Sequence, residues 1–273
     1  MMKCIATDLD GTLLTSSGNF SKKTIASFQY LKEQGYTIVV ASGRTDYELI
    51  DMLSPLQLED YDLAYIISYN GVKTTHLKSK KVLHEVFLSI EDSREIIKML
   101  NEADLKIHAF SKDTVYRSKD LIFQLHQTEN SPLKMKDINM HHWKVNHPLY
   151  KILVYEDENR LNEFKRHFQQ NKMMPFNLFK SHPRLLEFVA LNGTKGDALS
   201  RLCNDLGIQP KDVIAFGDEE NDISMLEFAG LGVAMGNAKS SVKEAANMVT
   251  LSNDFDGVSE VLSYYLISKE NKL

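Results

Sequence analysis

Two apolar segments joined by an amphipathic helix constrain the fold of this chain more than any other feature. The first segment runs from Cys4 to Ala6, and the second, rich in β-branched residues, from Tyr36 to Ala41. Between them Ser21 is a candidate helix N-cap, apolar residues recur at helical spacing, and Gly35 ends the helix. A strand that is apolar throughout is typically buried on both faces. The order strand–helix–strand therefore predicts a parallel sheet covered by helices.

The first strand ends in a pair of carboxylates. Asp8 and Asp10 are separated by one residue, so in an extended chain both side chains lie on the same side. Two carboxylates in that arrangement repel each other unless a proton or a cation intervenes. A surface turn is the alternative, since Asp and Gly are common in turns. Open parallel sheets bind ligands outside the carboxyl ends of their strands, which makes this loop a candidate site.

Four motifs in a fixed order carry a resemblance to a known family. They are Asp8-Leu9-Asp10-Gly11-Thr12-Leu13, Ala41-Ser42-Gly43-Arg44, Lys195-Gly196-Asp197-Ala198-Leu199 and Gly217-Asp218-Glu219-Glu220-Asn221-Asp222. Together they resemble the motifs of the haloacid dehalogenase (HAD) superfamily of phosphotransferases. Two further stretches, Met235-Gly236-Asn237-Ala238 and Asn253-Asp254-Phe255-Asp256-Gly257-Val258, are similar to those of its Cof-like phosphatases, which have a large inserted cap.

The resemblance implies an α/β fold with a Rossmann-like parallel-sheet core domain and an inserted α+β cap domain. The sequence from about Val82 to Val189 changes character accordingly, because helical and strand-like patterns mix there without a repeat. We therefore expect residues 1–82 and 189–273 to form the catalytic core. Residues 83–188 are expected to form the cap that determines substrate specificity.

For the reaction, the resemblance implies phosphoryl transfer through an aspartyl phosphate. Asp8 is expected to attack phosphorus, while Asp10 protonates the leaving alcohol and then activates water. The implied cofactor is Mg²⁺, a cation that prefers oxygen ligands. Its expected ligands are the side chains of Asp8 and Asp218 and the backbone carbonyl of Asp10. Asp222 would bind the metal directly or through water, or would instead be an acid at a helix N-terminus, stabilised by the helix dipole.

The remaining expected site residues lie on the phosphate side. The resemblance implies that Ser42 donates a hydrogen bond to the phosphoryl oxygens and that Lys195 neutralises their charge. Weaker candidates are Gly43 and Asn221 for the phosphate and Arg44 and Asn70 for the substrate. Three of these four have a structural alternative. Gly43 would permit a tight turn, Arg44 would form a salt bridge with a core carboxylate, and Asn70 would lie in a hairpin turn.

Composition narrows the class of partner. The chain has 273 residues, a formal net charge of −5 and a pI near 6.0, which argues against a nucleic-acid-binding protein. Cys4 and Cys203 are too few for a disulfide framework, and we expect both to be thiols in a cytoplasmic protein. No apolar run is long enough for a signal peptide or a membrane span. The partner that the resemblance implies is a small phosphorylated metabolite.

These features favour a Mg²⁺-dependent phosphatase acting on sugar phosphates or phosphorylated cofactors. A phosphomutase of the same superfamily is the first alternative, because Asp10 could equally take the proton from a second hydroxyl that attacks the phosphoenzyme in place of water. A non-catalytic phospholigand-binding protein is the second alternative. It would be favoured if Asp8, Asp10, Lys195 or Asp218 were replaced, and all four are present.

Overall fold

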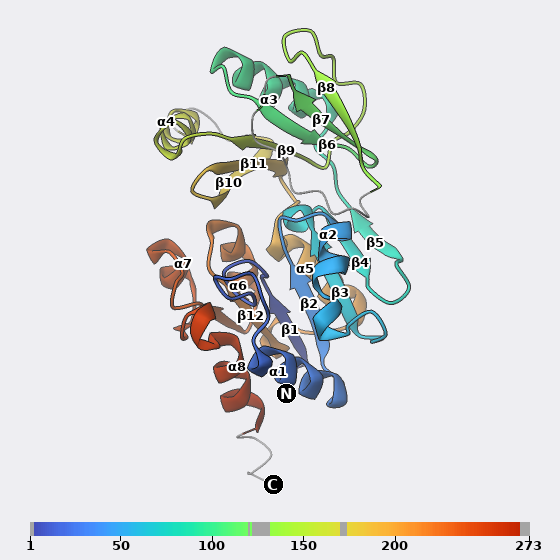
Figure 1. The fold of residues 1–273 in the computed structure, drawn as a ribbon, viewed down its shortest axis with the longest axis vertical. Coiled ribbons are helices and arrows are strands. Elements are labelled where there is room, and N and C mark those ends of the chain that lie inside the picture. The colour runs from blue at the N-terminus through green and yellow to red at the C-terminus, as the bar shows by residue number, and fades with distance from the viewer. Residues whose placement is uncertain (1–2, 120, 122–131, 170–173, 268–273) are drawn as a thin grey trace. The chain divides into compact units, whose positions relative to one another are not determined.

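The chain forms two compact units, each with its own sheet. The structure, a computed structural model, describes residues 3–119, 121, 132–169 and 174–267. One unit comprises Met1–His84 and Lys195–Leu273, and the other comprises Glu85–Thr194. The expected α/β core with an inserted second sheet is confirmed (Figure 1). The boundaries expected from the sequence, after residues 82 and 188, fall inside the strands β5 and β11.

The first unit is built on an eight-stranded sheet in the order β14-β13-β12-β1-β2-β3-β4-β5. Strands β14 to β3 are parallel, and β4 returns antiparallel to β3. The strands are β1 (Cys4–Thr7), β2 (Thr37–Ala41), β3 (Ala64–Ser68), β4 (Lys73–His76), β5 (Val82–Glu85), β12 (Val213–Gly217), β13 (Leu231–Ala234) and β14 (Met248–Val249).

Helices of this unit pack in two groups. Contacts join α1 to α8 in one group and α5 to α6 in the other, and α6 also contacts β12 and β13. The helices are α1 (Lys22–Glu33), α2 (Asp46–Met52), α5 (Lys195–Leu206), α6 (Ile223–Phe228), α7 (Ser240–Ala245) and α8 (Gly257–Leu262). The expected start of α1 is confirmed, because the side chain of Ser21 accepts a hydrogen bond from the backbone of Thr24.

In the described residues of the second unit a six-stranded sheet packs with two helices. Its strand order is β10-β11-β9-β6-β7-β8, with mostly antiparallel pairs. The strands are β6 (Ile107–Phe110), β7 (Thr114–Ser118), β8 (Lys134–Ile138), β9 (Lys151–Tyr155), β10 (Phe176–His182) and β11 (Leu185–Ala190), and the helices are α3 (Ile90–Glu102) and α4 (Glu158–Gln169). Separate helices and largely antiparallel strands give this unit the expected α+β character.

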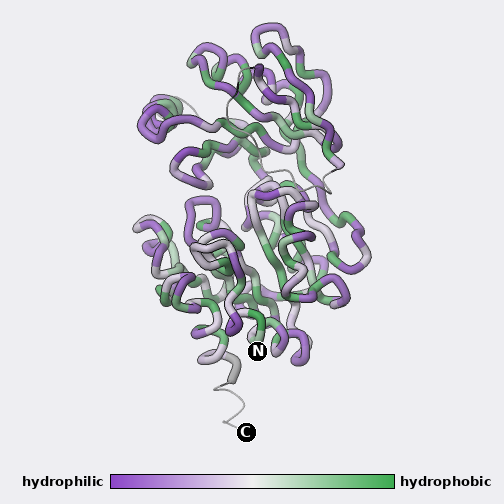
Figure 2. Tube along the Cα trace, viewed as in Figure 1, coloured by the Kyte–Doolittle hydropathy of each residue, from purple (hydrophilic) through white to green (hydrophobic). Residues whose placement is uncertain are grey.

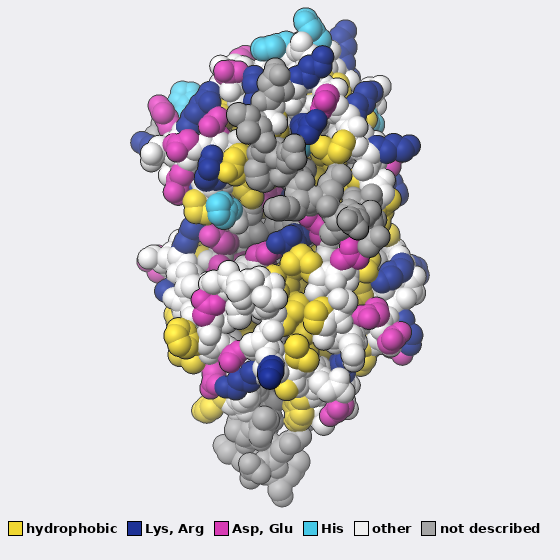
Figure 3. Space-filling view, in the orientation of Figure 1, with side chains coloured by type: hydrophobic (Ala, Val, Ile, Leu, Met, Phe, Trp, Pro, Cys, Tyr) yellow, Lys and Arg dark blue, Asp and Glu magenta, His cyan; other side chains and the backbone are white. Residues whose placement is uncertain are grey.

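Each unit buries a hydrophobic cluster of its own. In the first unit β1 and β2 are buried along their whole length, as the continuous apolar run in β2 predicts. In the second unit the cluster includes residues of α3, β6, β9 and β11. Hydrophobic stretches accordingly follow the strands of both sheets in Figure 2. On the face shown in Figure 3 acidic and basic side chains are interspersed, in keeping with 32 basic and 37 acidic residues.

Candidate active site

The parallel strands of the first unit bring the sequence motifs to one edge of the sheet. Strand β1 lies between β2 and β12, in register along all four of its residues. Asp8 follows β1, Ser42 follows β2 and Asp218 follows β12, so the three residues leave neighbouring strands at their carboxyl ends. The backbone N–H of Asp8 still donates to the carbonyl of Phe216, at 3.0 Å, which holds the first loop against β12.

Lys195 links the first and last of these motifs. Its Nζ donates to Oδ1 of Asp8 and to Oδ1 of Asp222, both at 2.6 Å, and its side chain is fully buried. Lys195 is the first residue of α5, and Gly196 follows it. A Cβ at position 196 would lie 2.3 Å from the backbone oxygen of Ser224, so glycine permits the close approach of α5 to α6. The Lys-Gly pair therefore positions the ammonium group between two carboxylates.

Both carboxylate oxygens of Asp222 accept hydrogen bonds from other groups of the protein. Its Oδ1 accepts from Lys195, and its Oδ2 accepts from the backbone N–H groups of Asp218 and Glu219, at 2.9 and 3.0 Å. The residue ends a 3-10 turn (Glu220–Asp222) and is the N-cap of α6, so it lies at a helix N-terminus as the alternative expected, but its side chain makes no capping hydrogen bond to α6. Asp222 orients both the lysine and the loop that presents Asp218.

The carboxylate of Asp218 is also held by neighbours. Oγ1 of Thr12 donates to its Oδ1 at 2.8 Å, and Nδ2 of Asn237 lies 3.4 Å from its Oδ2. The same amide donates to the carbonyl of Gly11 at 2.8 Å. Asn237 belongs to a stretch that the sequence singled out without a role, and no spacing rule would have predicted these two contacts. Asp8, Asp218 and Asp222 each offer a carboxylate oxygen within 4.8 Å of the others.

The charges of this cluster do not balance. Burial raises the pKa of Asp8 well above its ordinary value, and the neighbouring carboxylates add to this effect while Lys195 opposes it. Burial and Asp222 raise the pKa of Asp218 to about 7. Burial alone would lower the pKa of Lys195, but Asp222 and Asp8 raise it above its ordinary value. Three carboxylates therefore surround one ammonium group, which suits an additional cation, and their oxygen donors fit a hard ion such as Mg²⁺.

The carboxylate of Asp10 lies outside this cluster and is half exposed. Nε and Nη2 of Arg44 donate to its Oδ2 and Oδ1, both at 2.7 Å, in a bidentate pair. Hydrogen bonding to Asp10 raises the pKa of Arg44. Arg44 therefore forms a salt bridge, with a half-exposed carboxylate rather than one in the core, and its contact with substrate stays a prediction. Three of the four acidic residues expected at the site therefore cluster, and the carboxylate of the fourth, Asp10, is paired with arginine.

Asn70, Asn221 and Gly43 lie together beside Ser42. Asn70 lies in the turn between β3 and β4, and its backbone N–H donates to the carbonyl of Ser42 at 2.9 Å. Nδ2 of Asn221 donates to Oδ1 of Asn70 at 2.8 Å. Gly43 is not in the left-handed region, so the turn itself does not require glycine. A Cβ there would lie 3.0 Å from Oδ1 of Asn70, so glycine provides space for that amide.

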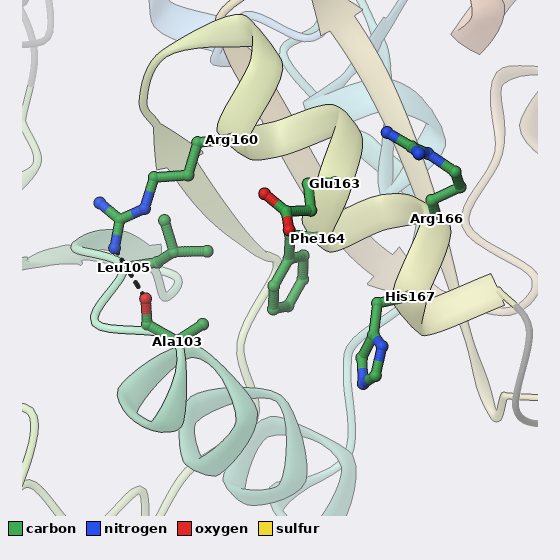
Figure 4. Close-up of a pocket in the computed structure, with 7 residues that line it drawn as sticks. All are labelled: Ala103, Leu105, Arg160, Glu163, Phe164, Arg166 and His167. Carbon is green, nitrogen blue, oxygen red and sulfur yellow. Dashed lines mark hydrogen bonds between the residues drawn. The ribbon is translucent and has the colours of Figure 1, made fainter.

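A cavity in the second unit is lined by basic and apolar residues and one glutamate, unlike the carboxylate cluster of the first unit (Figure 4). Its volume is about 440 Å³, and it is lined by Ala103, Leu105, Arg160, Glu163, Phe164, Arg166 and His167. Arg160 donates to the carbonyl of Ala103 at 2.8 Å and is therefore already engaged. Among the described residues, the cluster of acidic, His and Cys side chains able to hold a metal lies at Asp8, Asp218 and Asp222, and not here. The first unit therefore contains the better candidate active site.

Known proteins resemble this chain along nearly its whole length. A family model described as haloacid dehalogenase-like hydrolase matches residues 5–262. The putative phosphatase YxeH of Bacillus subtilis is 28% identical over 275 residues, covering 98% of this chain and 100% of the relative. The 5-amino-6-(5-phospho-D-ribitylamino)uracil phosphatase YcsE of the same species is 28% identical over 271 residues, covering 97% and 96%.

The fold has close counterparts among solved structures. A haloacid dehalogenase-like hydrolase from Bacteroides thetaiotaomicron superposes with a TM-score of 0.77 and is 31% identical, with 96% of this chain and 99% of that chain covered. In the part of the chain that the structure describes, we find no helix long and apolar enough to cross a bilayer.

Proposed function

Because this chain belongs to the haloacid dehalogenase-like hydrolases and is a phosphatase of that family, we propose that it hydrolyses small phosphorylated metabolites through an aspartyl phosphate on Asp8. The observation that carries this proposal is the buried arrangement of Asp8, Lys195 and Asp222 at the carboxyl end of the sheet. A buried ion pair of this kind is weak evidence for stability, since apolar residues would often serve as well. The free-energy cost of burying these charges is expected at an active site, where a reacting carboxylate must be fixed in position.

Asp8 is the nucleophile in this proposal. A carboxylate oxygen of Asp8 forms a bond to phosphorus as the bond from phosphorus to the leaving oxygen breaks, which leaves an acyl phosphate. Lys195 bonds to Oδ1 of Asp8 and so fixes the orientation of the carboxylate before the substrate arrives. The backbone N–H of Asp8, bonded to Phe216, anchors the same residue from the other end.

Asp10 transfers the protons. In the first step its carboxyl group gives a proton to the leaving alcohol, and in the second step its carboxylate takes a proton from water. That water attacks phosphorus, inorganic phosphate leaves and Asp8 is regenerated. Arg44 donates to both oxygens of the Asp10 carboxylate in a planar, bidentate pair, so the form that takes the proton from water has a defined orientation outside the acidic cluster.

Phosphate binding is assigned to the loops around Asn70. The hydroxyl of Ser42 and the amide of Asn221 would donate to phosphoryl oxygens, together with the ammonium of Lys195. Their placement supports this assignment, because both residues are hydrogen-bonded to Asn70. The N–H of Asn70 donates to the carbonyl of Ser42, and the amide of Asn221 donates to the side chain of Asn70. Gly43 leaves the space that Asn70 needs.

The metal site is proposed at the three clustered carboxylates. Asp8 and Asp218 would hold Mg²⁺ with their side chains and Asp10 with its backbone carbonyl. Both oxygens of Asp222 already accept hydrogen bonds within the protein. Asp222 would therefore contact the metal through water, or would support the site by holding the loop that carries Asp218. A bound cation would neutralise charge on the phosphoryl oxygens. Thr12 and Asn237 keep the Asp218 carboxylate oriented toward that role.

For the substrate, we propose a phosphate monoester of a sugar, a polyol or a cofactor. One relative over nearly the full length is named as a phosphatase for a ribityl phosphate, which is a polyol ester. The second unit, residues 85–194, would serve as the cap that selects the leaving group. A cytoplasmic location belongs to this proposal too, since both cysteines are free thiols.

The test is rapid acid quench followed by mass spectrometry of the peptide that contains Asp8, after a hydrolysis screen over phosphorylated metabolites. With an activated ester, whose leaving group needs no proton, Asp10→Asn should still form the phosphoenzyme and should accumulate it, because its breakdown loses about 10²–10⁴-fold. Asp8→Asn should show no label and no turnover. A label on another peptide, or equal turnover of the two variants, would refute the assignment.

A further inference from the structure

We infer that Asn70 is a positioning residue, whose side chain holds the amide of Asn221 in place beside Ser42 and Gly43. This inference rests on the proposed function, in which Ser42 and Asn221 contact phosphate. Three loops meet at Asn70, from the ends of β2, β3 and β12. Its N–H donates to the carbonyl of Ser42, and its Oδ1 accepts from Nδ2 of Asn221, 151 positions away.

The backbone at this turn is strained. Asn70 has φ 66°, and Tyr69 before it has φ 52°, so two consecutive residues other than glycine occupy the left-handed region. Asn tolerates that region better than most residues, but Tyr does not. Strain of this kind persists where the surroundings fix the conformation, and it is found most often at binding and catalytic sites. A hairpin that served only to reverse the chain would more often use glycine at these positions.

The amide of Asn70 is poorly suited to a purely structural role. The side chain is fully buried, yet among the described residues neither Nδ2 of Asn70 nor Oδ1 of Asn221 has a hydrogen-bond partner. A buried polar group left unsatisfied lowers stability. The side-chain amides of Asn70 and Asn221 therefore each lower stability through one unsatisfied atom. What they contribute in return is the hydrogen bond between them.

That bond leaves the second N–H of Asn221 available for a ligand. The Asn amide has two donor hydrogens, and Asn70 accepts one of them, which fixes the plane of the amide. Gly43 completes the arrangement, because the three atoms that a Cβ at position 43 would approach most closely all belong to Asn70, at 3.0, 3.1 and 3.4 Å. Asn70 thus determines both the orientation of Asn221 and the absence of a side chain at position 43.

The experiment compares Asn70→Gly, Asn221→Ala and the double variant for binding of inorganic phosphate by calorimetry in the presence of Mg²⁺, and for kcat and KM. Glycine keeps the left-handed turn and the N–H to Ser42, and removes only the amide. We expect Asn70→Gly to weaken phosphate binding and kcat/KM by about 10- to 100-fold, as small misplacements of binding groups do. The double variant should be no worse than Asn221→Ala alone, because Asn70 acts through Asn221.

Gln57→Gly is the matched control. Gln57 is also a residue with positive φ, 51°, but its side chain is exposed and its backbone carbonyl accepts from Lys32, in the last turn of α1. It should bind phosphate as the wild type does. Gly43→Ala tests the same contact from the other side and serves if Asn70→Gly does not fold. It should weaken phosphate binding in the wild type and cause no further loss in the Asn70→Gly background.

Phosphate binding by Asn70→Gly equal to the wild type would overturn the inference, and so would additive losses in the double variant. If Asn70→Gly does not fold, unchanged phosphate binding by Gly43→Ala would overturn it. The proposed function fails in a different way, through a wild-type protein that hydrolyses no phosphate monoester. The comparison of phosphate binding among the variants tests the contact between Asn70 and Asn221 whether or not the wild-type protein hydrolyses phosphate esters.

Discussion

Asp218 has a carboxyl group whose pKa lies near neutrality when no cation is bound, at about 7 against an ordinary 3.8, because it is buried beside Asp222. Between those values the folded protein keeps a proton that the unfolded chain has lost. Without a cation, the contribution of this group to stability therefore falls as pH rises from about 4 to about 7. At the proposed metal site Mg²⁺ would need the carboxylate form, so protons and Mg²⁺ should compete for Asp218.

Mg²⁺ should accordingly stabilise the protein more at higher pH. We expect the rise in melting temperature caused by Mg²⁺, relative to EDTA, to grow from pH 5.5 to pH 7.5, with apparent affinity changing about tenfold per pH unit below the pKa of Asp218. Thermal unfolding across this range is the measurement. Asp218→Asn should bind Mg²⁺ more weakly and lose most of this pH dependence. A variant with an unchanged Mg²⁺ titration would argue against Asp218 as a ligand.

Arg44 should matter most when the leaving group needs a proton. Arg44→Gln removes the bidentate contact that orients Asp10, so turnover of an alkyl phosphate should fall by up to about 10²-fold, while an activated aryl phosphate is affected much less. The ratio of the two rates is the measurement. Lys23→Gln, which breaks an exposed ion pair with Glu260, is the control and should leave the ratio unchanged. Equal losses for both esters would assign Arg44 to substrate binding instead.

At the scale of single elements, strand β4 is tied to helix α2 by a buried ion pair. Nζ of Lys73 lies 2.7 Å from Oδ2 of Asp46, and both side chains are at most 10% exposed. Lys73→Met would leave Asp46 buried without its counter-charge, which we expect to lower the free energy of unfolding by about 3–5 kcal/mol. Urea denaturation measures this loss. Lys78→Met, which breaks an exposed pair with Asp62, should cost at most about 1 kcal/mol.

Elements with strong local signals were predictable from sequence. The continuous apolar run of β2 and the Ser21 cap of α1 were identified correctly because hydrophobic burial and capping act over a few residues. Strand β4 was missed because its sequence, Lys-Thr-Thr-His, has no apolar residue. The hairpin turn expected at Asn70 is confirmed, because the chain returns there from β3 into the antiparallel β4.

The site was predictable to the extent that strand order determines it. Residues at the ends of β1, β2 and β12 converge because parallel neighbours end at one edge, so the proximity of Asp8, Ser42 and Asp218 follows from the motifs. The partners of each side chain do not follow, because they depend on loop conformation and rotamer. The contacts of Asp10 with Arg44 and of Asn237 with Asp218 are of this kind.

At the scale of the whole molecule, each unit has its own hydrophobic cluster and should fold independently. Replacing residues 85–194 by a flexible Gly-Ser linker should therefore leave a folded first unit. Hydrolysis of a small activated ester should partly survive, with the phosphoenzyme still on Asp8, whereas discrimination among natural phosphate esters should be lost. Circular dichroism and a substrate panel are the measurements. A folded first unit without any activity would show that residues 85–194 supply groups needed for the chemistry.

The position of β1 between β2 and β12 has a consequence for how the protein is made. At typical rates of synthesis, about 10–40 s separate the emergence of β1 from that of β12. During this interval the nascent chain can pair β1 with β2, but the other edge of β1 stays open, and an open apolar edge invites aggregation. The inserted unit is complete before β12 leaves the ribosome. Chains whose synthesis stops early should consequently depend on chaperones. If Asp218 and Asp222 belong to the active site as proposed, hydrolysis should begin only after both have been added.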